Sequence, residues 1–315
     1  MHMAEQRHLS NPALRGRLLL DEPMRKHLSW RTGGAADRAY VPADLDDAAR
    51  FLRSLPAGEP VYFIGLGSNL LVRDGGIRGT VLLMHASHAA MHMDGALIYA
   101  DARAASPKVA RYAATHGYAG AEFLAGIPGT VGGALAMNAG CYGSETWDRV
   151  ERVLMLGRSG ALRERKPADF DIAYRHVALK DAKSGAGLGA DEWFAAAWFR
   201  FERGDRAAAL GRIKELLQQR ISAQPLALPN AGSVFRNPPG DHAARLIEAC
   251  GLKGYAIGGA RVSEKHANFI VNAQGRGSAA DIENLIEHVK RTVLTQQGVE
   301  LVTEVRIIGE KAIAA

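Results

Sequence analysis

The sequence has few cysteines and no long apolar run. Its two cysteines, Cys141 and Cys250, have no His or Cys at metal-ligand spacing. This predicts reduced thiols, no disulfide framework and no metal site. No stretch approaches the ~18 consecutive apolar residues of a transmembrane helix, and the N-terminus has no apolar h-region. We therefore expect a cytoplasmic protein with no membrane partner.

Clustered positive charge is also missing. Lys and Arg number 39 against 33 Asp and Glu, but no run of five or more basic residues occurs. A solvated surface accounts for such a scattered excess, and attraction of an anionic small molecule is the functional alternative. No basic strip interleaved with aromatic residues is present, so we predict no nucleic-acid partner.

Two common nucleotide-binding signatures are absent as well. Gly65-Leu66-Gly67 follows an apolar run but is not a G-x-G-x-x-G, so a Rossmann site is not indicated. No G-x-x-x-x-G-K-[ST] occurs either. The chain is long enough for two or three domains of ~100–200 residues each.

Apolar periodicity, caps and breakers predict an alternation of helices and strands. Helices are expected over 44–55, 106–116, 205–223, 243–250 and 279–297, and strands over 61–64, 150–156, 193–201, 269–272 and 301–308. We expect three parts with approximate bounds 1–85, 86–203 and 204–315.

The stretch from Glu122 to Gly140 contains five glycines, one proline and almost no charge. Glycine inside a helix costs about 1 kcal/mol relative to alanine, so the stretch is not typical of a helix. Exposed amides without a neighbouring Cβ suit a phosphate or diphosphate. The alternative is a glycine-rich turn packed in a core.

Several short motifs follow one another in a fixed order. They are Trp30-Arg31-Thr32-Gly33-Gly34, Gly65-Leu66-Gly67-Ser68-Asn69-Leu70-Leu71, Gly126-Ile127-Pro128-Gly129-Thr130-Val131-Gly132-Gly133-Ala134, Tyr174-Arg175, Ala231-Gly232-Ser233-Val234-Phe235-Arg236-Asn237-Pro238, Ser263-Glu264-Lys265-His266-Ala267-Asn268-Phe269 and Glu304-Val305-Arg306. Together they resemble the UDP-N-acetylenolpyruvoylglucosamine reductase family, over roughly residues 22–309. The short spacing between Arg175 and Ser233 resembles the family's shorter form, which lacks a substrate-clamping tyrosine loop.

The resemblance implies an α+β protein with an FAD-binding fold of the vanillyl-alcohol oxidase type. Two subdomains would bind FAD non-covalently, and a third α/β domain would bind the substrate. It also implies an NADPH-dependent oxidoreductase acting on a CH–CH bond. The substrate would be UDP-N-acetylglucosamine enolpyruvate, a precursor in peptidoglycan synthesis, and the enzyme a monomer. An FAD oxidase or dehydrogenase with another substrate and an inactive nucleotide-sugar-binding regulator are the alternatives.

The resemblance assigns three catalytic residues. Ser233 would donate the proton to C2, while Arg175 and Glu304 would stabilise the enolate. Without the motifs, Ser233 would be interpreted as a serine that caps a turn, Arg175 as a surface arginine and Glu304 as a glutamate paired with Arg306. Glu304 would need to be protonated or hydrogen-bonded. Val177 stands where the family often has serine, so the contact of that serine is in doubt.

The remaining candidate residues also come from the resemblance. The cofactor residues are Gly65, Gly67, Ser68, Asn69, Leu70, Gly129, Thr130, Gly132, Gly133, Asn138 and Ala139. The substrate residues are Tyr174, Arg236, Asn237 and Lys265. We expect the amides of Gly129, Thr130 and Gly132 to face the FAD diphosphate and residues 134–140 to run beside the flavin. In this interpretation the glycines leave room for the cofactor.

Overall fold

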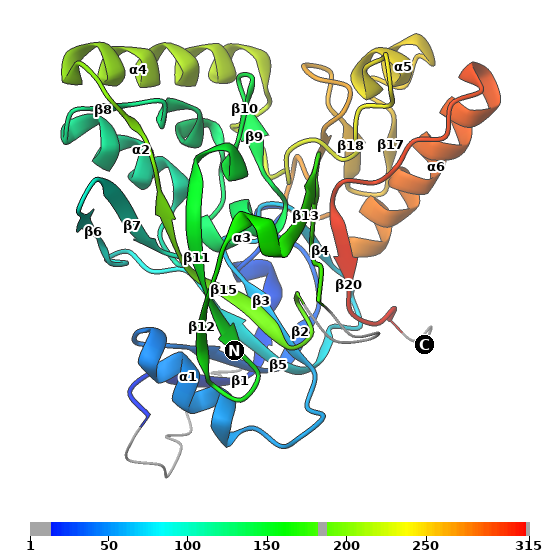
Figure 1. The fold of residues 1–315 in the computed structure, drawn as a ribbon. Coiled ribbons are helices and arrows are strands. Elements are labelled where there is room, and N and C mark those ends of the chain that lie inside the picture. Colours follow the sequence, from blue (N-terminus) through cyan, green and yellow to red (C-terminus); the bar gives the residue numbers. More distant parts are fainter. Residues whose placement is uncertain (1–13, 182–187, 313–315) are drawn as a thin grey trace. The chain divides into compact units, whose positions relative to one another are not determined.

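A computed structural model describes residues 14–181 and 188–312 of the chain (Figure 1). The chain divides into two compact units, each assembled from separate stretches. The first contains Met1–Leu20, Arg38–Leu66 and Thr80–Arg220, and the second contains Asp21–Asp37, Gly67–Gly79 and Ile221–Ala315. The division into parts 1–85, 86–203 and 204–315 stays a prediction.

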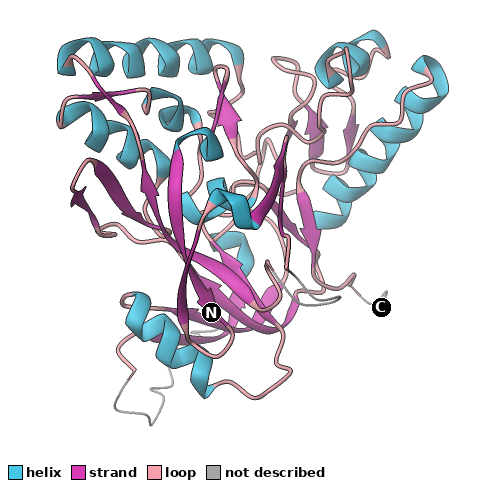
Figure 2. Ribbon diagram, viewed as in Figure 1, coloured by secondary structure: helices cyan, strands magenta, loops and turns pink. Residues whose placement is uncertain are grey.

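The first unit is built on a five-stranded antiparallel sheet in the order β12-β11-β15-β7-β6, drawn in magenta in Figure 2. Its strands are β6 Met91–Asp94, β7 Leu97–Asp101, β11 Val150–Gly157, β12 Leu162–Arg165 and β15 Glu192–Phe199. The central strand β15 is buried from Trp193 to Phe199. It therefore reads as a continuous apolar run rather than an alternating one.

A second sheet has the order β1-β2-β5-β3, with β3 parallel to β5. Its strands are β1 Arg17–Pro23, β2 Ala35–Val41, β3 Val61–Ile64 and β5 Ile77–Leu83. Strands β1, β2 and β5 each carry the chain from one unit into the other. Helix α1 (Leu45–Ser54) begins after Asp44, whose carboxylate accepts a hydrogen bond from the amide of Asp47. This side-chain cap is the expected start of the predicted helix.

The other elements of the first unit are short, apart from two helices. They are α2 Ser106–Thr115, α3 Val131–Ala136, α4 Arg206–Ala223, β8 Tyr118–Ala119, β9 Gly140–Cys141, β10 Ser144–Glu145, β13 Phe170–Ala173, β14 His176–Leu179, β16 Glu202–Arg203 and the 3-10 turns Glu122–Gly126, Thr146–Arg149 and Pro167–Asp169. Helix α4 runs on from this unit into the second.

The second unit combines a three-stranded antiparallel sheet, order β17-β18-β19, with a parallel pair formed by β4 and β20. Its elements are β4 Leu70–Val72, β17 Ala256–Ile257, β18 Ala260–Val262, β19 Ile270–Val271, β20 Arg306–Ile308, α5 Ala243–Ala249, α6 Ala279–Gln297 and the 3-10 turn Met24–Lys26. Ser278 and Asp281 form a capping box at the start of α6, and Gly298 ends it in the left-handed region.

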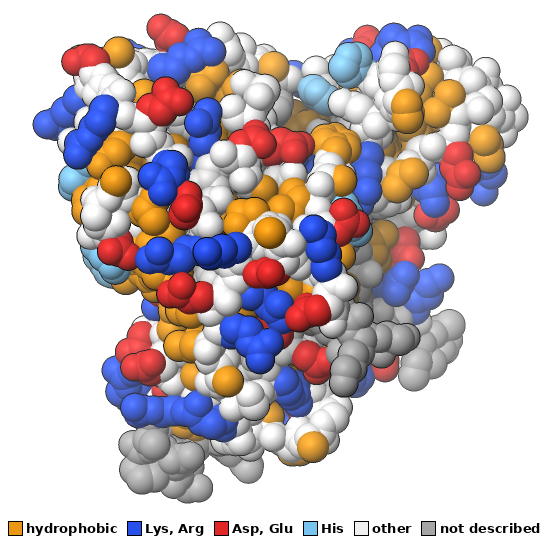
Figure 3. Space-filling model, viewed as in Figure 1, with side chains coloured by type: hydrophobic (Ala, Val, Ile, Leu, Met, Phe, Trp, Pro, Cys, Tyr) orange, Lys and Arg blue, Asp and Glu red, His pale blue; other side chains and the backbone are white. Residues whose placement is uncertain are grey.

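Most predicted helices and strands are confirmed within one or two residues at each end. Two expectations are wrong. Residues 131–136 of the glycine-rich stretch form helix α3, and the final strand is confined to residues 306–308, so Glu304 precedes it. Among the described residues, none of the helices has the length and apolar character needed to cross a membrane. Basic and acidic side chains are interspersed on the face drawn in Figure 3.

Candidate functional site

The glycines of the Glu122–Gly140 stretch are explained mainly by close packing against protein atoms. A Cβ on Gly126 would lie 2.6 Å from the Cys141 sulfur, and one on Gly140 would lie 2.5 Å from the Ser144 carbonyl oxygen. A Cβ on Gly132 would approach the Cβ of Ala102 to 3.1 Å. The interpretation that the glycines leave room for a cofactor is therefore wrong at these three positions. Gly133 differs, because it is exposed and its nearest neighbour would be 3.7 Å away.

The expectation that three amides face the FAD diphosphate is wrong for Gly132 and stays a prediction for Gly129 and Thr130. The amide of Gly132 donates to the carbonyl of Ala102 at 2.9 Å, so it is not available to a ligand. The amides of Gly129 and Thr130, both buried residues, have no acceptor among the described residues. Buried backbone amides are rarely left without an acceptor, so these two are the better candidates for a bound anion.

The end of β3 brings a second predicted cofactor residue to this stretch. A Cβ on Gly65 would collide with the hydroxyl of Thr130. That hydroxyl also accepts a weak hydrogen bond, at 3.4 Å, from the amide of Gly133, as the N-cap of α3. Gly65, Thr130 and Gly133 are thus brought together within the first unit, from two segments distant in sequence.

Arg175 lies at the tip of the β13–β14 hairpin, with φ +56°. Its guanidinium donates to the carbonyl oxygens of Asn138 and Gly140, at 3.3 Å each. Tyr174 is exposed, and its ring lies 5.2 Å from the Arg175 guanidinium carbon. A bulky residue at positive φ is a strained conformation that clusters at functional sites.

Asn138 holds this end of the stretch in place. It is 2% exposed and has φ +41°. Its side-chain amide donates to the Glu145 carboxylate at 2.7 Å and to the carbonyl of Ala173 at 3.3 Å. Ala139 is tied by its own amide to the Ala134 carbonyl at 2.8 Å. Val177, the departure from the family pattern, is buried in the core of the unit. The structure thus brings Arg175, a predicted site residue, to the end of the glycine-rich stretch.

The cysteine next to this stretch, Cys141, is an unreactive thiol. The Cys141 thiol donates to the Phe123 carbonyl at 3.0 Å, and burial raises its pKa to about 11. Burial also lowers the pKa of the neighbouring Arg220, whereas Tyr142 and Cys141 act in the opposite direction. Cys141 therefore stays a thiol at neutral pH.

The rest of the predicted cofactor loop lies in the second unit. Gly67 has φ +58°, and its carbonyl accepts hydrogen bonds from the amide and hydroxyl of Ser29, at 3.2 Å each. The side-chain amide of Asn69 donates to the Glu304 carbonyl at 3.2 Å, and the Arg306 amide donates to the Asn69 carbonyl at 3.1 Å. The loop, which also contains Ser68 and runs into β4 at Leu70, is therefore bonded to the segment that carries Glu304.

Ser233 lies between two bends, on a segment that hydrogen-bonds to the same region. The amide of Glu304 donates to the Val234 carbonyl at 2.7 Å, so the backbones of Ser233 and Glu304 are close neighbours. The Ser233 hydroxyl makes no hydrogen bond with any described residue. Asn230 provides the cap of this turn instead, through its side-chain oxygen and the Gly232 amide at 3.0 Å.

Asn268 orders the Ser233 segment and was not among the predicted site residues. It is 3% exposed, and its side chain exchanges two hydrogen bonds with the backbone of Phe235, at 2.9 and 2.8 Å. Its carbonyl accepts the Val234 amide at 2.9 Å. The signal was present, since Asn268 belongs to the Ser263–Phe269 motif, but an asparagine in a motif does not reveal that it binds backbone.

The predicted substrate residues of the second unit differ in their surroundings. Asn237 is exposed, and its side-chain oxygen accepts the Ala243 amide at the start of α5. The amide of Arg236 donates to the Val302 carbonyl at 2.9 Å. The Lys265 ammonium donates to the Ile221 carbonyl at 2.7 Å and lines a recess of about 520 Å³ that also contains Arg261.

Comparison with known proteins gives two matches to sequence models of protein domains. Residues 36–164 match the sequence model of an FAD binding domain, and residues 224–308 match that of the UDP-N-acetylenolpyruvoylglucosamine reductase C-terminal domain.

Whole-chain relatives agree with these matches. The chain is 58% identical to the UDP-N-acetylenolpyruvoylglucosamine reductase of Thiobacillus denitrificans, over 95% of this chain and 94% of that protein. It is 57% identical to the one from Nitrosospira multiformis, over 96% and 92%. The crystal structure of the reductase from Thermus caldophilus is similar with a TM-score of 0.76 and 28% identity, covering 93% of this chain and 99% of that one. The predicted α+β fold of the FAD-binding type is confirmed.

Proposed function

Because the chain belongs to the UDP-N-acetylenolpyruvoylglucosamine reductase family, we propose that it reduces UDP-N-acetylglucosamine enolpyruvate to UDP-N-acetylmuramate with NADPH as the donor. The proposal places the reaction in peptidoglycan precursor synthesis. The chemistry that FAD would supply there is hydride transfer, taken from NADPH and delivered from flavin N5 to C3 of the enolpyruvyl group.

The first unit offers groups that fit an FAD diphosphate. Gly129 and Thr130 are buried, their amides have no acceptor within residues 14–181 and 188–312, and Gly133 beside them is exposed. Gly65 lies against Thr130. Backbone N–H groups of this kind bind anionic oxygens without a charged side chain. Gly67, Ser68, Asn69, Leu70, Asn138 and Ala139 complete the proposed set.

The proposed role of Ser233 rests on one observation. Its hydroxyl has no hydrogen-bond partner among the described residues. A serine hydroxyl is a very weak acid in water. It can protonate C2 because the enolate formed at that carbon is itself strongly basic. Its backbone is held by Val234, which bonds to both Asn268 and Glu304.

Arg175 and Glu304 are proposed to stabilise the enolate. The guanidinium of Arg175 is oriented by the carbonyls of Asn138 and Gly140, and its planar fork is the donor group that suits a carboxylate. The backbone of Glu304 is held on both sides, by Asn69 and by Val234. Tyr174, Arg236, Asn237 and Lys265 are proposed to contact the sugar nucleotide, with Lys265 and Arg261 providing positive charge at the recess for its phosphates.

An anaerobic half-reaction experiment tests the proposal. NADPH should bleach the flavin absorbance of the purified protein, and the enolpyruvyl sugar nucleotide should restore it. In Ser233→Ala, bleaching should proceed at the wild-type rate while restoration slows by about 10²–10⁴-fold, the usual contribution of a positioned acid.

The exposed Ser87 provides a control, because Ser87→Ala should leave both half-reactions unchanged. Loss of both half-reactions in Ser233→Ala would reject the assigned role. A purified wild-type protein that binds no flavin on reconstitution would reject the proposed function itself.

A further inference from the structure

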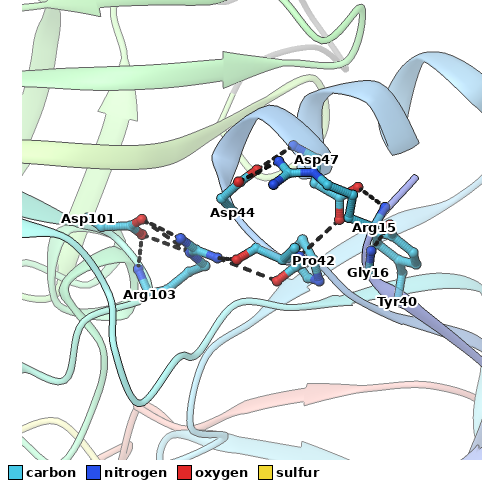
Figure 4. A network of polar contacts seen from close by, with 9 residues as sticks. Arg15, Gly16, Tyr40, Pro42, Asp44, Asp47, Asp101 and Arg103 are labelled. Atoms are coloured by element: carbon cyan, nitrogen blue, oxygen red, sulfur yellow. Dashed lines mark hydrogen bonds and ion pairs between the residues drawn. The ribbon is translucent and has the colours of Figure 1, made fainter. Parts of the chain in front are cut away.

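A buried ion pair lies beside the residues proposed to hold the FAD diphosphate. Asp101 ends β7, and Arg103 follows two residues later; they are 2% and 5% exposed. The Arg103 guanidinium donates to both oxygens of Asp101, at 2.7 to 3.2 Å, and the Arg103 amide donates to the same carboxylate at 2.8 Å. Figure 4 shows the guanidinium and the carboxylate facing each other.

The same guanidinium also binds a second loop. It donates to the carbonyl oxygens of Pro42 and Ala43, at 3.4 and 3.0 Å, in the turn between β2 and α1 (Figure 4). That turn is itself fixed, because the fully buried carboxylate of Asp47 accepts the Ala43 amide at 2.9 Å and the Tyr40 hydroxyl at 2.8 Å. Arg103 therefore connects a firmly held turn to the loop after β7.

The loop after β7 is one wall of the proposed diphosphate site. Its carbonyls at Ala102 and Ala104 accept the amides of Gly132 and Val131, at 2.9 and 2.8 Å. The amide of Ser106 donates to the Gly129 carbonyl at 2.9 Å. The Gly129 carbonyl and the Thr130 amide belong to one planar peptide group, so the bond from Ser106 fixes the direction of the Thr130 amide, and the bonds at Val131 and Gly132 hold the residues that follow. The position of the loop thus sets the direction of the Thr130 amide.

Burying two charges is an expensive way to hold a loop, and apolar residues of similar volume often stabilise a fold equally well. The benefit of the pair lies in its geometry. Arginine has five donors in a rigid fork, and here they engage two carboxylate oxygens and two carbonyls at once. A lysine ammonium has three donors at one point and cannot span both loops.

We propose that Asp101 and Arg103 are positioning residues that set the affinity for FAD without touching it, by fixing the loop that orients the Thr130 amide beside that of Gly129. The inference rests on the proposed FAD site. It concerns residues that neither the family's motifs nor the predicted site contained.

The test measures FAD binding and apoprotein stability separately. Apoprotein variants Arg103→Met, Arg103→Lys and Asp101→Asn are titrated with FAD by flavin fluorescence, and the melting temperature of each apoprotein is recorded. We expect Arg103→Met to weaken FAD binding by about 10-fold to 100-fold, the range expected when hydrogen bonds to a charged group are lost. Arg103→Lys should recover only part of the affinity.

Arg165 provides a matched control in the same unit. It is also buried, 8% exposed, and pairs with Glu192 at 2.9 Å and Asp181 at 3.1 Å, but it makes no bond to the loop after β7. Arg165→Met should lower the melting temperature of the apoprotein and leave the FAD affinity within about twofold.

The outcomes separate the two levels of the argument. Wild-type protein that binds no FAD would reject the proposed function. If wild-type protein binds FAD and Arg103→Met binds it equally well, or if Arg165→Met weakens FAD binding as much as Arg103→Met does, the inference is wrong. If Arg103→Met does not fold, Arg103→Lys decides, because unchanged affinity in that variant also rejects the proposal.

Discussion

The Glu122–Gly140 stretch and the segment from Asn230 to Asn237 are both rich in small residues, yet they hold their functional groups in opposite ways. In the first, glycines are required because protein atoms approach from outside, as at Gly126. In the second, Gly232 has nothing within 4 Å of its missing Cβ but has φ +74°. Three glycines of the first stretch, Gly126, Gly132 and Gly140, therefore serve packing, and the single glycine of the second segment serves backbone conformation.

The two segments also differ in what satisfies the backbone. Backbone groups of the loop after β7 occupy the amides of Val131 and Gly132 in the first segment. In the second, backbone carbonyls accept the amides of Val234 and Arg236, whereas the side chains of Asn230 and Asn268 accept those of Gly232 and Phe235. A segment whose amides depend on side-chain acceptors is more sensitive to single substitutions than one held by backbone pairing. The following substitutions test this difference between the two segments.

The largest effect is expected for Asn268→Ala. The substitution leaves the amide and carbonyl of Phe235 without partners in a fully buried position. Each unsatisfied buried group costs about 1–3 kcal/mol, so for two groups the free energy of unfolding should fall by roughly 2–6 kcal/mol. Urea denaturation monitored by tryptophan fluorescence measures it. A loss below about 1 kcal/mol would show that the Phe235 backbone finds other partners. The second segment would then depend little on side-chain acceptors.

A smaller loss is expected for Gly126→Ala. The new methyl group would overlap the Cys141 sulfur and the Tyr142 ring, and overpacking of this kind costs about 1–3 kcal/mol. The double variant Gly126→Ala/Cys141→Ala removes one of the colliding atoms and should recover part of the stability. If it recovers nothing, close packing is not the reason for glycine at 126.

The smallest effect is expected for Gly232→Ala. There is space for a methyl group, so only the left-handed backbone opposes it, at about 1 kcal/mol. Gly251→Ala is the matched control, because Gly251 has φ +68° and also has open space. The two variants should lose similar stability. A clearly larger loss at Gly232 would indicate a packing role that the structure does not record.

Local signals predicted the elements whose ends are fixed by neighbouring side chains. Helix α6 is predicted from its first to its last residue because Ser278 caps it and Gly298 ends it. The motifs also pointed to Arg175 and Ser233, whose catalytic roles stay predictions.

Features fixed by contacts between residues distant in sequence could not be predicted in this way. Helix α3 forms in the glycine-rich stretch because Thr130 caps it and Ala102 needs Gly132 beside it, and neither fact follows from local propensity. The bond of Gly132 to Ala102 used an amide expected to face a ligand. Asn268 and Arg103 act through backbone groups far from them in sequence, which no pattern of residue types reveals.

The pairing of β4 with β20 has a consequence for how the protein forms during synthesis. Leu70 to Val72 bond to Arg306 to Ile308, near the other end of the chain, and the Trp30 indole donates to the Ile270 carbonyl. Contacts between such distant residues form late, after the loop between them has been closed. The Gly67–Leu70 loop thus emerges from the ribosome long before its partners exist. Flavin loading that depends on this loop must therefore follow translation of the last strand.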